Sequence, residues 1–169
     1  MKKMNTKMLV TAGILIALNI ILSRFLSINA WNLKIGFTFI SVFIAAYFFG
    51  PALGAIVAGL GDFLGAILFP IGAYFPGFTF TAVLTGLLYG ILLHKKQTPL
   101  RVVVAVAADQ LILSLLLNTL WISILYGSPF IPLLATRVIQ CLVMIPVEFL
   151  TISVITKVLV HTRREVLQQ

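Results

Sequence analysis

Long apolar stretches, separated by short polar or proline-containing breaks, run along the whole chain. A membrane-spanning helix needs about 20 apolar residues, and six stretches approach that length: 7–27, 35–50, 52–69, 78–94, 100–126 and 130–160. The breaks between them contain glycine and proline, which end or begin helices. The pattern therefore predicts an all-α integral membrane protein with six transmembrane helices in one bundle, and residues 1–169 form a single domain.

Composition supports the same class. The chain is 61% hydrophobic and only 9% charged, with a mean hydropathy of +1.15, whereas a soluble domain carries roughly 25% charged residues. A net charge of +8 is common in nucleic-acid-binding proteins. Here the lysines and arginines gather at the ends of the apolar stretches, which indicates membrane topology and no nucleic-acid partner. The single cysteine, Cys141, excludes an internal disulfide and a cysteine-based metal cluster.

Basic residues also predict the orientation. They gather before residue 8, in the break at 94–101 and after residue 156. With six spans these three regions share one face, and positively charged short segments stay on the cytoplasmic side. We therefore expect a multi-pass protein of the cell membrane with N and C termini cytoplasmic, and the proline- and phenylalanine-rich loop 70–77 outside.

Several polar residues fall inside the predicted spans, where an ionisable group is costly unless it is paired or functional. A rise of about 1.5 Å per residue puts the strongest of them in the outer half of four different spans. They are Arg24, Asp62, Asn118, Trp121, Arg137 and Gln140. We expect these side chains to meet in one outward-facing substrate pocket.

The loop above this level consists of rings and turn formers without charge. It supplies Phe69, Tyr74, Phe75 and Phe78 as candidates for stacking on a planar ligand. We expect loop 70–77 to act as a lid, with glycines as hinges and prolines limiting its range.

Simpler structural roles remain open for these residues. Asp62 could pair with Arg24 or Arg137 to hold the bundle, and Asn118 or Trp121 could serve in helix packing. Asp109 and Glu148 fall in the inner half, so we expect them to be structural or to face a partner, away from the outer cluster.

Small residues mark two helix faces. Gly54, Ala58, Gly61 and Gly65 recur at helical spacing in the third span, which favours close helix approach. In the first span, Ala12, Gly13 and Ala17 form a patch that could seat another subunit or pack internally.

No catalytic motif, phosphate-binding loop or metal-ligand spacing occurs in the chain. The prediction is that it is not an enzyme, binds no metal and carries no cofactor. If ATP drives its activity, the ATPase is another chain.

Four segments resemble a known family: "ILSRFLSI" (21–28), "LKIGFTFISV" (33–42), "GDFLGAILFPIGAYFPGFTFTAVLTGLLYG" (61–90) and "LNTLWISILYG" (117–127). They are similar to the substrate-binding S components of energy-coupling factor (ECF) transporters, most of all to the folate-specific members. The resemblance implies a six-helix fold, a vitamin bound in an outward-facing pocket beneath loops, and three partners: a membrane coupling subunit and two cytosolic ATPase subunits. The family's docking motif on the first span is typically Ala-x-x-x-Ala, for which Gly13-x-x-x-Ala17 is the nearest match.

Ligand chemistry also favours folate. A carboxylate such as Asp62 can accept hydrogen bonds from the pterin edge, and arginines suit the glutamate tail. The outer cluster of Arg24, Arg137 and Asp62 carries about +1, which favours an anion over thiamine. The alternatives are an S component for another vitamin (riboflavin, biotin, pantothenate or thiamine), a small autonomous carrier, or an assembly subunit without ligand.

Overall fold

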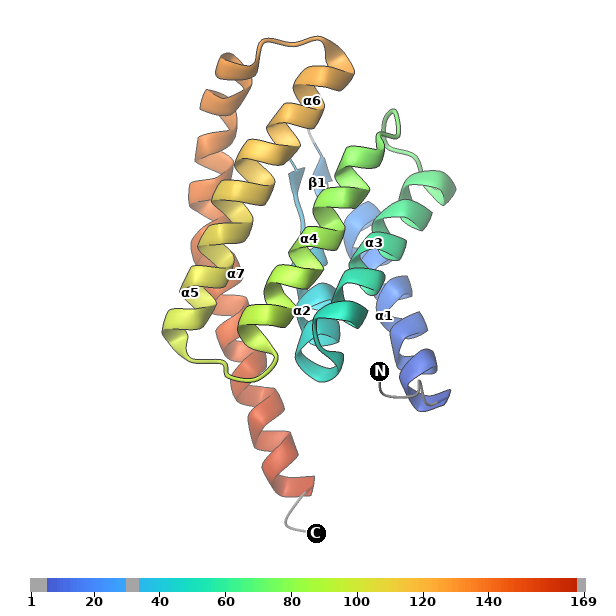
Figure 1. The fold of residues 1–169 in the computed structure, drawn as a ribbon, viewed down its shortest axis with the longest axis vertical. Helices are drawn as coiled ribbons and strands as arrows, with labels where there is room; N and C mark the ends of the chain where they lie inside the picture. The colour runs from blue at the N-terminus through green and yellow to red at the C-terminus, as the bar shows by residue number, and fades with distance from the viewer. Residues whose placement is uncertain (1–5, 30–33, 167–169) are drawn as a thin grey trace.

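A computed structural model describes residues 6–29 and 34–166. The chain forms a bundle of long helices with one small hairpin among them (Figure 1). The elements in order are α1 (Thr6–Arg24), β1 (Ile28–Asn29), β2 (Lys34–Ile35), α2 (Thr38–Phe49), α3 (Pro51–Leu68), α4 (Pro76–Leu93), α5 (Pro99–Ala108), η1 (Asp109–Leu117), α6 (Asn118–Tyr126) and α7 (Phe130–Val166).

Helix boundaries follow the proline and glycine breaks. Pro51, Pro76 and Pro99 each occupy the first turn of a helix, where the missing N–H costs nothing and the fixed φ suits the helix. Gly50 and Gly127 take φ values of 85° and 64°, which glycine adopts without strain. The predicted breaks are therefore confirmed.

Five helical stretches are long and apolar enough to cross a membrane: α1, α3, α4, the continuous α5–η1–α6 rod and α7. The second predicted span, 35–50, corresponds to the shorter apolar helix α2 of 12 residues, which is about 18 Å long against the roughly 30 Å of a bilayer core. The first residue of the predicted span, Ile35, belongs to the hairpin, in which it pairs with Ile28. The predicted all-α membrane fold holds apart from this hairpin.

Helices α3 and α4 approach each other through glycines. A Cβ atom added to Gly86 would clash with the backbone of Gly54, and one added to Gly90 would clash with Pro51. Small residues let two backbones come this close in lipid. The predicted role of the α3 small-residue stripe in close packing is thereby confirmed for Gly54.

The largest buried cluster fills the end of the bundle near the α4–α5 loop. It contains Phe43, Tyr89, Leu93, Val106 and Ile152, none of them exposed. The start of α1, the α4–α5 loop and the end of α7 lie at this same end, with α7 projecting beyond the other helices (Figure 1). This arrangement agrees with the predicted shared face of the basic regions, although Lys2 and Lys3 lie outside the described residues. The opposite end, which carries the α3–α4 loop, is called the outer end below, after the predicted orientation.

Ala12 requires a correction. It is 5% exposed and packs with Leu15, Ala45 and Val57 inside the bundle, so it does not belong to a surface for another subunit. Gly13 and Ala17 are exposed, and a Cβ on Gly13 would meet no atom within 4 Å. These two residues alone keep the predicted surface position.

Candidate functional site

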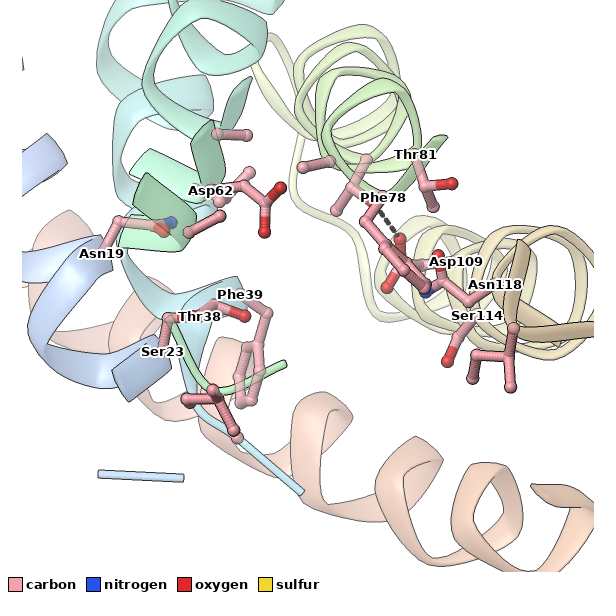
Figure 2. A pocket seen from close by; sticks show the side chains of 18 of the residues that line it. Asn19, Ser23, Thr38, Phe39, Asp62, Phe78, Thr81, Asp109, Ser114 and Asn118 are labelled. Atoms are coloured by element: carbon pink, nitrogen blue, oxygen red, sulfur yellow. Dashed lines mark hydrogen bonds between the residues drawn. The ribbon is translucent and has the colours of Figure 1, made fainter. Parts of the chain in front are cut away.

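A cavity of about 540 Å³ occupies the bundle between its outer end and the buried cluster. Its volume falls in the range of small-molecule sites, roughly 300–1,000 Å³. Helices α1 to α4, the η1–α6 segment, α7 and the α3–α4 loop all contribute to its wall. Figure 2 shows Asn19, Ser23 and Asp62 on one side of it and Thr81, Asp109 and Asn118 on the other.

Eight of the predicted binding residues line this cavity: Arg24, Asp62, Tyr74, Phe75, Phe78, Asn118, Arg137 and Gln140. Phe69 and Trp121 do not. Phe69 is 44% exposed, and its ring packs edge-on against Phe25 at a centroid distance of 5.2 Å. Trp121 lies one layer behind the wall, where its Nε1 donates to Thr81 Oγ1 at 3.0 Å and its ring is 5.7 Å from that of Phe75.

Asp62 is tied to the α3–α4 loop. Thr79 Oγ1 donates to Asp62 Oδ2 at 2.8 Å, and the Tyr74 hydroxyl lies 3.3 Å from the same Thr79 oxygen. The Tyr74 ring also packs edge-on against Phe63 of α3 at 5.8 Å. Within the described residues Thr79 is the hydrogen-bond partner of Asp62, and Arg24 is near enough for a Coulombic attraction to Asp62 without a close ion pair.

Arg24 and Asn19 rest on the glycines of α3. A Cβ on Gly65 would lie 3.1 Å from Arg24 Nε, and one on Gly61 would lie 2.7 Å from Asn19. Asn19 donates to Ser41 Oγ at 2.9 Å, which links α1 to α2. Arg24 Nε is buried and has no hydrogen-bond partner among the described residues, so the mouth of the cavity holds a guanidinium with unused donor capacity.

Arg137 enters from α7 and is 5% exposed. Its NH2 group donates to the Ser114 carbonyl oxygen at 3.2 Å, whereas its Nε has no partner within the described chain. Gln140, one helical turn further along α7, is also buried at the wall. Both polar groups predicted for span six therefore reach the cavity.

The η1 segment is a nine-residue π-helix inside the fifth span. Gln110, Ser114, Asn118 and Ile122 all line the cavity. In an α-helix, residues four positions apart are rotated slightly in one direction around the helix axis, and in the wider π-helix they are rotated slightly in the opposite direction. Because this segment combines both kinds of helix, the four residues stay on one face. The π-helix thus gives the cavity a straight wall of mostly polar side chains.

Asp109 and Glu148 lie on the wall of the same cavity, which corrects their predicted separation from the outer cluster. Thr85 donates to Asp109 Oδ1 at 2.7 Å, and Glu148 accepts from Tyr89 at 3.2 Å and from Gln110 at 2.7 Å. The whole lining thus has two arginines and three acids, formally −1, whereas the outer cluster of Arg24, Arg137 and Asp62 alone carries the expected +1. The net charge of the lining therefore does not favour an anionic ligand. A preference for an anion would have to come from the positions of the arginines in the cavity.

The sequence did contain a signal for this deeper part. Thr81, Thr85 and Tyr89 recur every four residues on α4, and each bonds a polar group of a neighbouring helix. A polar stripe on an otherwise apolar span indicates a hydrated or ligand-binding face.

In the part of the chain that the structure describes, no group of three histidine, cysteine, aspartate or glutamate side chains comes together. His94 Nδ1 lies 2.9 Å from the Tyr47 carbonyl oxygen at the end of α2, which is a structural contact.

Comparison with known proteins covers nearly the whole chain. The family model described as the substrate-specific component of ECF transporters matches residues 7–156. Folate transporter FolT of Clostridium novyi (strain NT) is 38% identical over 153 residues, 90% of this chain and 88% of the relative. Folate transporter FolT of Leuconostoc mesenteroides subsp. mesenteroides is 33% identical, over 86% and 82% of the two chains.

Solved structures agree. A crystal structure of FolT bound with folic acid matches with a TM-score of 0.84 and 34% identity, over 88% of this chain and 92% of the other. The S component of a bacterial ECF transporter matches in fold with a TM-score of 0.54 and 23% identity, over 95% and 97% of the two chains. The resemblance predicted from the four segments is confirmed: this membrane protein belongs to the substrate-specific S components of ECF transporters.

Proposed function

We propose that the chain is the folate-binding subunit of an ATP-driven ECF vitamin importer in the cell membrane. The observation that carries the proposal is the cavity, whose arginines, acids and rings come from six helical regions and the α3–α4 loop. The likeness to a FolT structure bound with folic acid, at a TM-score of 0.84, supports the choice of vitamin.

Each part of folate finds suitable chemistry in the cavity wall. The guanidinium groups of Arg24 and Arg137 can hold the carboxylates of the glutamate tail. Aspartates, with Asp62 the one expected from the sequence, can accept from the donors of the pterin ring. Phe75 and Phe78, whose centroids are 6.1 Å apart, offer faces and edges for the planar parts.

Loop 70–77 serves as the lid in this proposal. Ile71, Gly72, Ala73, Tyr74 and Phe75 line the cavity, and all but Phe75 are exposed on the other side. An uncharged cover of this kind excludes water and strengthens the polar contacts beneath it.

Transport then depends on other chains. A membrane coupling subunit would dock on the exposed face of α1 around Gly13 and Ala17, and two cytosolic ATPase subunits would hydrolyse the ATP. This chain itself catalyses no reaction and holds no cofactor, and its termini face the cytoplasm.

One observation favours a second candidate. The formal charge of −1 on the lining suits a cationic vitamin such as thiamine better than an anion. The two arginines on the lining and the similarity to folate transporters make folate the better candidate.

Calorimetric titration of the detergent-purified chain with folate, thiamine, riboflavin, biotin and pantothenate tests the proposal. We expect saturable 1:1 binding of folate and far weaker heats for the others. Preferential binding of another vitamin would overturn the folate assignment. Uptake by vesicles that contain this chain alone would favour the autonomous carrier.

A further inference from the structure

The net charge of the sequence is concentrated in three segments. The stretches before residue 8, at 94–101 and after residue 156 hold nine of the twelve lysines and arginines and one of the four acids. Together they carry a formal charge of +8, which is the net charge of the whole chain, so the remaining residues are neutral as a group. Most of these cations must therefore find their counterions outside the chain.

The middle one of these segments, the α4–α5 turn, is held in a fixed shape by hydrogen bonds to backbone carbonyls. Gln97 Nε2 donates to the His94 carbonyl oxygen at 3.2 Å. Arg101 NH1 donates to the Leu92 carbonyl oxygen at 3.3 Å. The His94 ring in turn lies on the end of α2, with Nδ1 2.9 Å from the Tyr47 carbonyl oxygen. The turn is therefore fixed to α2 and α4 before any partner binds.

Three cations belong to this turn. Lys95 and Lys96 are exposed, and Arg101 uses one of its five N–H donors on the Leu92 carbonyl. The acids of the described residues, Asp62, Asp109 and Glu148, all line the cavity.

Exposed apolar side chains continue from the turn along both helices. Ile91, one helical turn before Lys95 on α4, is 67% exposed, and Leu100 at the start of α5 is 73% exposed. Val104, one turn further along α5, is 48% exposed. Because side chains of this kind belong in the hydrocarbon of a bilayer, the cations beside them lie at the level of the lipid headgroups. The anions available at that level are lipid phosphates.

We propose that the α4–α5 turn binds the headgroup of one anionic phospholipid. Lys95 and Lys96 attract the phosphate as point charges, and the guanidinium of Arg101 donates to its oxygens. The acyl chains lie along the exposed apolar residues of α4 and α5. The first turn of α5 contains no acid, so the positive end of its dipole adds to the attraction. This site lies outside the cavity and does not depend on which vitamin the cavity takes.

The test measures which lipids stay bound to the detergent-purified full chain in native mass spectrometry. The chain is offered equal amounts of phosphatidylglycerol and phosphatidylcholine with the same acyl chains. Wild type should retain phosphatidylglycerol about fivefold or more over phosphatidylcholine, because only the former carries a net negative charge. In the triple variant Lys95→Gln, Lys96→Gln, Arg101→Gln this ratio should fall to within about twofold.

A matched control removes the same three charges from another segment. Lys2→Gln, Lys3→Gln, Lys7→Gln changes the N-terminal segment, and α1 begins on the far side of α3 from the α4–α5 loop (Figure 1). This variant should keep the wild-type ratio. An equal loss in both triple variants would show a diffuse attraction by net charge and would overturn the site.

Folding is controlled separately. Arg101→Gln also removes the bond to the Leu92 carbonyl, so the double variant Lys95→Gln, Lys96→Gln replaces the triple one if that does not fold, and it should lower the ratio at least about twofold. Folate titration should be unchanged in each variant, because none of the changed residues lines the cavity.

The remaining outcomes are decisive as well. A wild-type chain that retains both lipids equally overturns the proposal. So do variants of the turn that keep the wild-type ratio but no longer assemble with the ATPase subunits, since the turn is then a surface for a protein. Neither outcome affects the proposed function, which the vitamin titrations test by themselves.

Discussion

At the scale of single residues, the charged groups of the cavity are held by neutral partners. Arg137 donates to a carbonyl oxygen, and Asp62 and Asp109 each accept from a threonine. Such bonds fix the direction of a side chain and leave most of its hydrogen-bonding capacity for a ligand. Mutual ion pairs would have used that capacity.

Arg137→Ala should weaken folate binding at least tenfold, about 1.4 kcal/mol. The guanidinium is buried with an unpartnered Nε, so the ligand loses a charge-assisted contact. Calorimetry on the purified variant measures the change. Lys157→Ala is the control, since Lys157 is exposed on α7 and outside the cavity lining. Unchanged affinity in a folded Arg137→Ala protein would remove Arg137 from the binding site.

At the scale of elements, the α3–α4 loop is fastened to the bundle at two points. Tyr74 reaches Asp62 through Thr79, and Phe75 packs on Trp121, whose indole is held by Thr81. Gly77 makes room for this, because a Cβ there would lie 2.6 Å from both rings. The loop is thus connected to α3 on one side and to α6 on the other.

Tyr74→Phe and Thr79→Val should each accelerate folate dissociation several-fold, because either change breaks the Tyr74–Thr79–Asp62 connection. Since both act on one connection, the double variant should be little faster than the single ones. Stopped-flow displacement measures the rates. Fully additive effects on the logarithm of the rate would mean that the two residues act independently.

The contact between α3 and α4 predicts a clear contrast between two glycines. Gly86→Leu should destabilise the protein by about 1–3 kcal/mol or more, because its Cβ meets the backbone of α3. Gly13→Leu should leave the melting temperature unchanged, since Gly13 faces open space. Thermal unfolding in detergent compares them, and equal melting temperatures would contradict the close contact.

At the scale of the whole molecule, binding and transport should separate. Leucine at Gly13 or Ala17 adds bulk to the exposed face of α1, so folate binding by the purified chain should be unchanged. Uptake by vesicles that also contain the coupling and ATPase subunits should fall on the order of tenfold, because small residues allow close helix docking in lipid. Loss of binding in these variants would show that the face is internal packing.

The family, the spans and the position of the cavity follow from local features that need no partner in space. Pro51, Pro76 and Pro99 begin helices wherever they occur because the constraint on φ is built into the residue. The depth of Asp62 or Arg137 follows from counting residues along a helix of fixed rise. Eight predicted residues line one cavity for this reason.

Which way a side chain points around its helix was decided only by the tertiary structure. In a membrane the lipid-facing side of a helix is as apolar as the packed side, so the sequence of α1 does not reveal that Ala12 faces inward while Gly13 and Ala17 face outward. The inner limit of the cavity is decided in the same way. Asp109 and Glu148 belong to its wall because they form hydrogen bonds there with Thr85, Tyr89 and Gln110. The sequence of a single segment does not predict which distant segment it will contact.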